Sequence, residues 1–225
     1  MIDWGGISAL VCAYLLGSIP SAVWIGKILY NLDVREFGSG NSGATNAFRV
    51  LGKKAGIAVL LIDVLKGWSA VNIAYIFDVS LFSQSYLMNF KLSLGVASLL
   101  GHIFPVYAGF RGGKGIATLL GLMIAIHPKA AIAALIVFLI VFLATRFVSL
   151  GSICAALSFP LILLFIYHET VSSLIIFSLF ISILTLITHQ KNIERLLKRE
   201  ESRARIRLNI KRSVHPDEDD EEMEE

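Results

Sequence analysis

Residues 130–145 read A-A-I-A-A-L-I-V-F-L-I-V-F-L-A-T, an apolar run without a charged residue that is typical of a membrane-spanning helix. A helix needs about 20 mostly apolar residues, roughly 17 to 25, to cross a bilayer. Six more apolar runs lie around this one, at residues 7–28, 57–77, 92–107, 116–126, 150–167 and 171–187. Together they predict an all-α integral membrane protein, a bundle of seven helices.

The composition agrees with a membrane protein and excludes an ordinary soluble domain. Of 225 residues, 56% are hydrophobic and only 16% are charged, and the mean hydropathy is +0.72. The run at 116–126 is short for a span, so five or six crossings are also compatible with the lengths. We prefer seven crossings because the basic loops between the runs then all lie on one side of the membrane, as the positive-inside rule requires.

Basic residues set the predicted orientation, since cytoplasmic loops carry an excess of Lys and Arg. Nothing basic precedes the first run, so we place the N-terminus outside. Seven crossings then put every strongly basic segment, including the C-terminus, in the cytoplasm. The inner basic residues of the loops are Lys27, Arg35, Arg49, Lys53, Lys54, Arg111, Lys114 and Arg146, whereas the outer turns hold mainly Asp78, Lys129, His168 and Glu169.

The charge pattern also divides the chain into three parts. Residues 1–190 form the predicted polytopic membrane domain. Residues 191–212 hold nine Lys or Arg against three Glu, which indicates a cytoplasmic segment beside the membrane, attracted to anionic lipid or an anionic substrate. Residues 213–225 are acidic, as expected of a disordered tail.

Two ionisable residues, Asp63 and Lys66, lie inside the second run and share a helix face. Ionisable groups within a span are costly and are functional candidates by default. The alternative is a local ion pair that stabilises the packing of the bundle. The sequence leaves both open and favours the structural role.

The first loop contains G-S-G-N-S-G-A-T-N-A-F-R, residues 38–49. As a dinucleotide fingerprint it is weak, because a membrane helix and not a strand precedes it. Its glycines still allow the backbone to approach an anion, and Arg49 offers a positive fork suited to phosphate. Glycines and neutral donors that we expect to line this loop are Ser39, Gly40, Asn41, Gly43, Thr45 and Asn46.

The second segment is G-H-I-F-P-V-Y-A-G-F-R-G-G-K-G-I-A-T, residues 101–118. It resembles a phosphate-binding loop but departs from the Walker motif at Ala108 and Gly115. The turn at Gly112 and Gly113 opens the fourth run, so the positive end of that helix points at whatever Lys114 binds. Lys114 is the strongest candidate for a phosphate-binding cation.

The third segment, T-H-Q-K-N-I-E-R-L-L, begins where the seventh run ends. If the helix continues, His189 and Asn192 share one face, with Glu194 and Arg195 turned away. The orientation places His189 on the same side as Arg49 and Lys114. These residues describe a site for a small phosphorylated substrate at the membrane surface, without a catalytic triad, a metal cluster or a thiol outside the apolar runs.

These segments, with V-S-L-G-S at residues 148–152, resemble the signature loops of the acyl-phosphate-dependent glycerol-3-phosphate acyltransferases. The resemblance extends to about Glu201. The chain departs from the family at Arg111, where Lys is usual, and at Arg199, where Gly is usual. The resemblance implies that the site is lined by Ser39, Asn41, Thr45, Asn46, Arg49, Lys114, Ser152, His189 and Asn192.

The family resemblance implies transfer of a fatty acyl group from acyl phosphate to the primary hydroxyl of glycerol 3-phosphate, which yields lysophosphatidic acid and inorganic phosphate. A substrate phosphate would accept the hydroxyl proton, and no metal, cofactor or acyl carrier is required. The expected partners are long-chain acyl phosphate, glycerol 3-phosphate and membrane lipid, with no nucleic acid. The expected protein is a multi-pass monomer of a bacterial cytoplasmic membrane.

Two other classes of function stay open. A transporter of phosphorylated small molecules would use the same cations, but it would place them near the bilayer midplane on broken helices. Asp63 and Lys66 favour that class. A lipid-binding scaffold would explain the basic segment at 191–212 but not the two glycine loops.

Overall fold

The computed structural model describes residues 4–76 and 83–204, which form helices and, within these ranges, no strand. Asp78, residues 205–212 of the basic segment and the whole acidic tail at 213–225 lie outside the described residues. The elements are α1 (Trp4–Gly17), α2 (Ser21–Tyr30), η1 (Val34–Glu36), α3 (Ala44–Val50), α4 (Lys53–Asn72), η2 (Ile73–Ile76), α5 (Gln84–Ile103), η4 (Val106–Ala108), α6 (Ile116–Ile126), α7 (Pro128–Thr145), α8 (Val148–Leu161), the π-helix η5 (Ile162–Ile166), α9 (Ser172–Thr188) and α10 (Gln190–Leu197).

Where the structure describes them, the seven apolar runs are largely helical. Among the described residues, four continuous helices are long and apolar enough to cross a membrane, namely Lys53–Ile76, Gln84–Ala108, Pro128–Thr145 and Val148–Ile166. Two bent pairs, α1 with α2 and α9 with α10, raise the number to six if each pair is one span. The fourth run forms only the 11 residues of α6. The structure therefore confirms an all-helical chain with several apolar helices, and seven crossings stay a prediction.

The first and seventh runs do not continue as straight helices. Between α1 and α2 the axis turns by 43°, just where Pro20 stands. Proline has no N–H to donate and disfavours helical geometry in the residue before it, so the helix stops at this point. Between α9 and α10 the axis turns by 61° at His189. Both bends lead into segments that carry candidate site residues.

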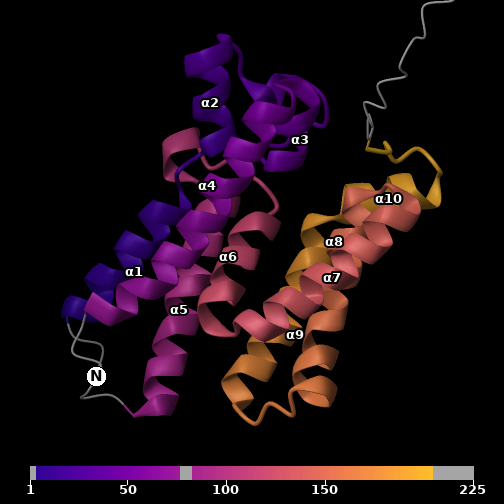
Figure 1. Cartoon of the computed structure of the whole chain (residues 1–225). Coiled ribbons are helices and arrows are strands. Elements are labelled where there is room, and N and C mark those ends of the chain that lie inside the picture. The colour runs from indigo at the N-terminus through magenta and orange to yellow at the C-terminus, as the bar shows by residue number, and fades with distance from the viewer. Residues whose placement is uncertain (1–3, 77–82, 205–225) are drawn as a thin grey trace, which may run out of the picture.

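The helices form two groups, α1–α6 and α7–α10 (Figure 1). Within the first group, α4 and α6 approach backbone to backbone because each carries a glycine at the crossing. A Cβ atom on Gly67 would lie 2.0 Å from the carbonyl oxygen of Thr118, and one on Gly121 would lie 1.8 Å from that of Val64. Small residues at helix crossings in membranes permit this close contact. It holds the N-terminal turn of α6 firmly against α4.

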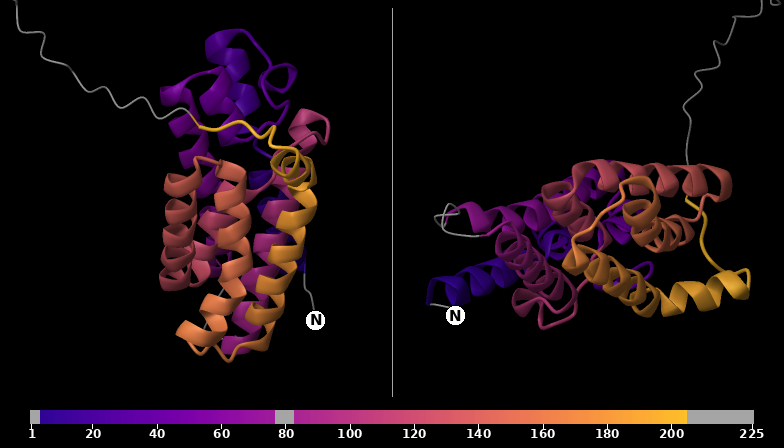
Figure 2. Two further views of the ribbon diagram at one scale, coloured as in Figure 1. Left: turned by 90° about the vertical axis from the view of Figure 1, so that its right-hand side faces the viewer. Right: turned by 90° about the horizontal axis from the view of Figure 1, so that it is seen from below.

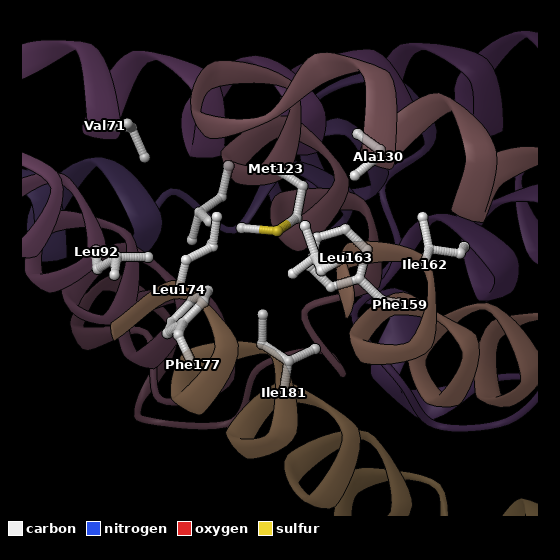
Figure 3. Close-up of a cluster of buried hydrophobic side chains, with 12 residues drawn as sticks. Val71, Leu92, Met123, Ala130, Phe159, Ile162, Leu163, Leu174, Phe177 and Ile181 are labelled. Atoms are coloured by element: carbon white, nitrogen blue, oxygen red, sulfur yellow. The ribbon is translucent and has the colours of Figure 1, made fainter. Parts of the chain in front are cut away.

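A cluster of buried apolar side chains joins the two groups of helices (Figure 3). It draws on α4, α5, α6, α7, α8, η5 and α9. Its members are Val71, Leu92, Leu122, Met123, Ala130, Ala131, Phe159, Ile162, Leu163, Leu174, Phe177 and Ile181. The groups are thus fastened at one end, while α2, α3 and α10 lie at the opposite end (Figures 1 and 2).

Candidate active site

The first loop, residues 31–43, leads from α2 into α3 and is held by its own polar side chains. Asp33 accepts hydrogen bonds from the guanidinium of Arg35 at 2.7 and 2.9 Å. The other end of that guanidinium donates to the carbonyl oxygen of Ala108 at 2.8 Å. Arg35 therefore ties the first loop to the second segment, which the sequence alone did not indicate.

Asn46 organises the first loop from inside. It is 1% exposed, and its Oδ1 accepts a hydrogen bond from the backbone N–H of Ser39 at 2.9 Å. Its Nδ2 donates to the carbonyl oxygens of Val34 and Phe37 at 2.7 and 3.1 Å. Because these bonds use both ends of the amide, the expectation that Asn46 offers a free donor to the site is wrong. Asn46 instead fixes the loop on which Ser39 and Gly40 stand.

The second segment folds back on the end of α5. The backbone N–H of Gly112 donates to the carbonyl oxygen of Ile103 at 3.2 Å, and that of Gly113 donates to His102 at 3.1 Å. Gly115 caps α6 with a φ of +83°, a left-handed conformation that suits glycine. Lys114 thus stands between two anchored glycines, directly before the N-terminus of α6. This placement agrees with the sequence prediction.

The third segment bends at His189 and then returns toward the membrane helices. Asn192 and Arg195 lie three residues apart in α10 and both bond Glu201, so the prediction that Arg195 turns away is wrong, although Glu194 is exposed as expected. After α10, Arg199 adopts a φ of +61°, at the position where the similar family usually has Gly. The left-handed residue reverses the chain, so that Glu201 reaches back to Arg195, whose Nε lies 2.8 Å from Oε2.

A single polar cluster joins the second and third segments. The ammonium of Lys114 donates a hydrogen bond to Oδ1 of Asn192, which is 7% exposed. Nδ2 of Asn192 donates to Oε1 of Glu201 at 2.6 Å, and the hydroxyl of Ser149 donates to the same oxygen at 2.6 Å. The structure therefore brings together Lys114 from the first helix group with Ser149, Asn192 and Glu201 from the second.

The electrostatics of this cluster follow from its burial. Burial lowers the pKa of the Lys114 ammonium to about 8, while Glu201 opposes the shift and Arg195 and Arg49 add to it. Burial alone would raise the pKa of Glu201, but hydrogen bonds from Ser149, Arg195 and Asn192 lower it below its usual value. Arg49 and Arg195 are therefore each close enough to Lys114 to repel its ammonium. A bound phosphate would relieve that repulsion.

His189 lies beside the cluster and is 3% exposed. Its Nδ1 is 2.9 Å from the carbonyl oxygen of Thr185. Since a carbonyl can only accept, Nδ1 carries the hydrogen in this contact, and Nε2 is left as an acceptor in the neutral ring. His189 can thus accept a hydrogen bond from a substrate hydroxyl.

A sequence model of the family described as glycerol-3-phosphate acyltransferase matches residues 7–199. The chain belongs to this family. It is 39% identical over 227 residues to a glycerol-3-phosphate acyltransferase of Chlorobium phaeobacteroides, covering 89% of this chain and 97% of the relative. It is 40% identical over 210 residues to that of Enterococcus faecalis, covering 90% of this chain and 94% of the relative.

Two solved structures share the fold. One is the crystal structure of the integral membrane glycerol 3-phosphate acyltransferase PlsY in its glycerol 3-phosphate form. Its TM-score is 0.78 at 40% identity, and the match covers 89% of this chain and 96% of that one. The lysophosphatidic acid form of PlsY matches with a TM-score of 0.74 at 38% identity, covering 88% and 94%.

Other candidates from the first loop of this family member lie near the surface. Ser39, Gly40 and Thr45 are exposed, and Gly40 has a φ of +70°. Asn41 uses its Oδ1 to accept from the backbone N–H of Gly43 at 3.0 Å, which shapes the turn into α3. The hydroxyls of Ser39 and Thr45 therefore stay available for a substrate, whereas Asn41 has a structural contact.

In the fourth signature, residues 148–152, Ser149 contacts the cluster, and Ser152 as a site residue stays a prediction. The hydroxyl of Ser152 donates to the carbonyl oxygen of Val148, within its own helix, at 2.9 Å. Ser149, one turn earlier, makes the contact with the cluster. Ser149, Arg195 and Glu201 are thus members of the polar cluster that the sequence analysis missed. The Gly that the family usually has at position 199 was the one signal of a sharp return after α10.

Proposed function

We propose that this protein transfers a fatty acyl group from acyl phosphate to the primary hydroxyl of glycerol 3-phosphate. The observation that carries the proposal is the cluster in which Lys114 bonds Asn192, and Asn192 and Arg195 both bond Glu201, at the end of the bundle where the glycine loops meet. Membership of the glycerol-3-phosphate acyltransferase family supports the acceptor. So do the glycerol 3-phosphate and lysophosphatidic acid forms of the similar PlsY.

The reaction needs no nucleophile from the protein, because acyl phosphate is already activated. The hydroxyl oxygen of glycerol 3-phosphate forms a bond to the acyl carbonyl carbon, and a tetrahedral oxyanion results. Its collapse breaks the bond from that carbon to the phosphate oxygen, and inorganic phosphate leaves. The hydroxyl proton passes to a substrate phosphate, whose second pKa near 6 suits it as a base. The products are lysophosphatidic acid and inorganic phosphate.

The protein would contribute binding, orientation and charge. Lys114 and Arg49 neutralise phosphate, with Ser39, Thr45 and the backbone N–H groups of the glycine loops as further donors. His189 accepts a hydrogen bond from glycerol 3-phosphate through Nε2, and Asn192 fixes Lys114. Glu201 balances part of the positive charge before the substrate arrives.

The proposed setting is a bacterial cytoplasmic membrane, with the site at the cytoplasmic surface. Seven crossings remain our proposal, with α6 as the short fourth one. The bacterial relatives and the basic loops of the site end support this orientation. We propose long-chain acyl phosphate as donor, a monomeric enzyme, and no cofactor or metal.

The test is phosphate release from purified protein in lipid, supplied with palmitoyl phosphate and glycerol 3-phosphate. Release that requires both substrates, with lysophosphatidic acid formed in equal amount, is the expected result. Release without glycerol 3-phosphate would indicate a phosphatase instead. Uptake of glycerol 3-phosphate into liposomes without any lysophosphatidic acid would support the competing transporter.

A further inference from the structure

Behind the candidate site lies a second polar cluster that the proposed reaction does not use. It consists of Asp63 and Lys66 on α4 and His102 on α5, which are 1%, 5% and 6% exposed. The ammonium of Lys66 is 2.9 Å from Oδ1 of Asp63, and Nδ1 of His102 is 3.8 Å from the same oxygen. Burying ionisable groups inside helices of a membrane protein is expensive, so their contacts call for a role.

On one side, this cluster forms hydrogen bonds to the residues at the break between α1 and α2. Ser21, at the start of α2, donates its hydroxyl to Oδ1 of Asp63 at 2.7 Å. Lys66 donates to the carbonyl oxygen of Ile19 at 2.9 Å. The pair on α4 thus holds the residues on both sides of Pro20, Ile19 and Ser21. Because α2 leads into the first loop, these two hydrogen bonds set where that loop begins.

On the other side, His102 holds the glycine turn. The carbonyl oxygen of His102 accepts the hydrogen bond from the N–H of Gly113, and its ring lies directly below that glycine. A Cβ atom on Gly113 would lie 2.3 Å from Nε2 of the ring, and its three nearest atoms all belong to this ring. Nδ1 of His102 is 2.9 Å from the hydroxyl of Thr118, in the first turn of α6.

We propose that Asp63, Lys66 and His102 form a positioning network that holds the glycine turn, and with it Lys114, in the geometry that binds substrate phosphate. None of the three contacts the substrate. Asp63 and Lys66 fix α2 and α4 relative to one another, and the ring and carbonyl oxygen of His102 contact the turn at Gly113. This role rests on the proposed function, because the phosphate concerned is that of a substrate of the acyl transfer.

The network predicts a particular kinetic signature. A displaced glycine turn weakens phosphate binding, which raises KM for glycerol 3-phosphate. A purely structural defect instead lowers the fraction of folded enzyme, so apparent kcat falls and KM is unchanged. Two substitutions of His102 separate its contacts. His102→Asn can keep the hydrogen bond to Thr118 but removes the ring below Gly113, whereas His102→Phe keeps the ring and loses that bond.

The pair on α4 needs a variant that folds. Removing one partner alone leaves a buried uncompensated charge, which strongly destabilises a protein, whereas replacing both by apolar residues of similar size is often tolerated. The double variant Asp63→Leu with Lys66→Met is therefore the informative one. Ser182→Ala is the matched control, because it removes a buried hydrogen bond of 2.7 Å from α9 to Ala156 of α8, away from the network.

The experiment measures KM and kcat for purified wild type and variants, together with the rise in melting temperature that glycerol 3-phosphate causes. We expect His102→Asn and the double variant to raise KM about tenfold or more and to lose most of the ligand-induced rise. Ser182→Ala should keep both values. Unchanged KM and unchanged ligand-induced stabilisation in both network variants would overturn the proposal, whatever their kcat.

A double-mutant cycle adds a test that does not depend on stability. Gly113→Ala should impair the enzyme because its Cβ atom meets the His102 ring, and the smaller side chain of His102→Asn should relieve that contact. The double variant is then less impaired than the two single effects predict together. Additive effects would contradict contact-based positioning.

The same measurements distinguish failure of this proposal from failure of the proposed function. Wild type that does not turn over, yet is stabilised by glycerol 3-phosphate, would refute the acyl transfer and leave the network to be judged by the loss of stabilisation in its variants. Wild type with neither turnover nor stabilisation would refute both.

Discussion

Titration of Lys114 should set the alkaline limit of activity. Burial favours the neutral amine and lowers the pKa of Lys114 to about 8, so the ammonium that we propose binds phosphate is retained below that pH and lost above it. Lys114→Arg keeps a cation at every accessible pH, because a guanidinium does not deprotonate in this range. The variant should therefore abolish the alkaline limb of the pH profile, even if its rate at neutral pH is lower.

The magnitude follows from the ionised fraction. With a pKa of about 8, Lys114 is charged in roughly nine-tenths of free enzyme molecules at about pH 7 and in roughly one-tenth at about pH 9. The value of kcat/KM for glycerol 3-phosphate reports the free enzyme, so it should fall about tenfold over this interval. Bound phosphate stabilises the ammonium, and the limb in kcat should therefore lie at higher pH.

The assay is formation of radiolabelled lysophosphatidic acid from labelled glycerol 3-phosphate at saturating palmitoyl phosphate, from about pH 6.5 to about pH 9.5. A blank without enzyme corrects for alkaline loss of the donor. A flat wild-type profile would refute the reasoning. An identical alkaline limb in Lys114→Arg would also refute it, because the limb would then belong to another group.

Three further predictions concern the same end of the bundle and its packing. Glu201→Gln should move the alkaline limb to lower pH, because Glu201 raises the pKa of Lys114; an unmoved limb would show that the carboxylate does not act on Lys114. Arg49→Ala should lower kcat/KM about tenfold or more, whereas Lys53→Ala, which removes the same charge at the start of the next helix, α4, should have little effect in the same assay. Gly67→Ala should reduce the free energy of unfolding by about 1–3 kcal/mol, because its Cβ atom would lie 2.0 Å from a carbonyl oxygen of α6. The melting temperature in detergent should fall accordingly, and an unchanged melting temperature would contradict the close helix contact.

The helices were largely predictable because apolar length is a local property. A run such as residues 130–145 needs no tertiary information to be identified as helical, and it coincides with α7. The bends were not predicted. Pro20 is visible in the sequence, but whether the chain continues, kinks or stops at a proline depends on which neighbours receive the freed backbone groups. Here Lys66 binds the carbonyl oxygen beside the break.

Convergence of the site was predictable from charge, but the partners of individual side chains were not. The same-side placement of Lys114 and the third segment agrees with the hydrogen bond from Lys114 to Asn192. Asn46 and Ser152 matched signature positions, yet Asn46 uses its amide to hold the first loop and Ser152 donates within its own helix. Glu201 is an acidic residue in a basic segment, and only the return of the chain after α10 brings it to Lys114.

The most direct test of the central claim compares acyl donors with the purified protein. Labelled glycerol 3-phosphate is supplied with either palmitoyl phosphate or palmitoyl-coenzyme A, and lysophosphatidic acid is measured for wild type and Lys114→Ala. We predict that wild type forms lysophosphatidic acid with palmitoyl phosphate but not with palmitoyl-coenzyme A. We predict that Lys114→Ala forms none, although it melts at nearly the wild-type temperature. Product from the coenzyme A thioester only, or full activity of Lys114→Ala, would contradict the account.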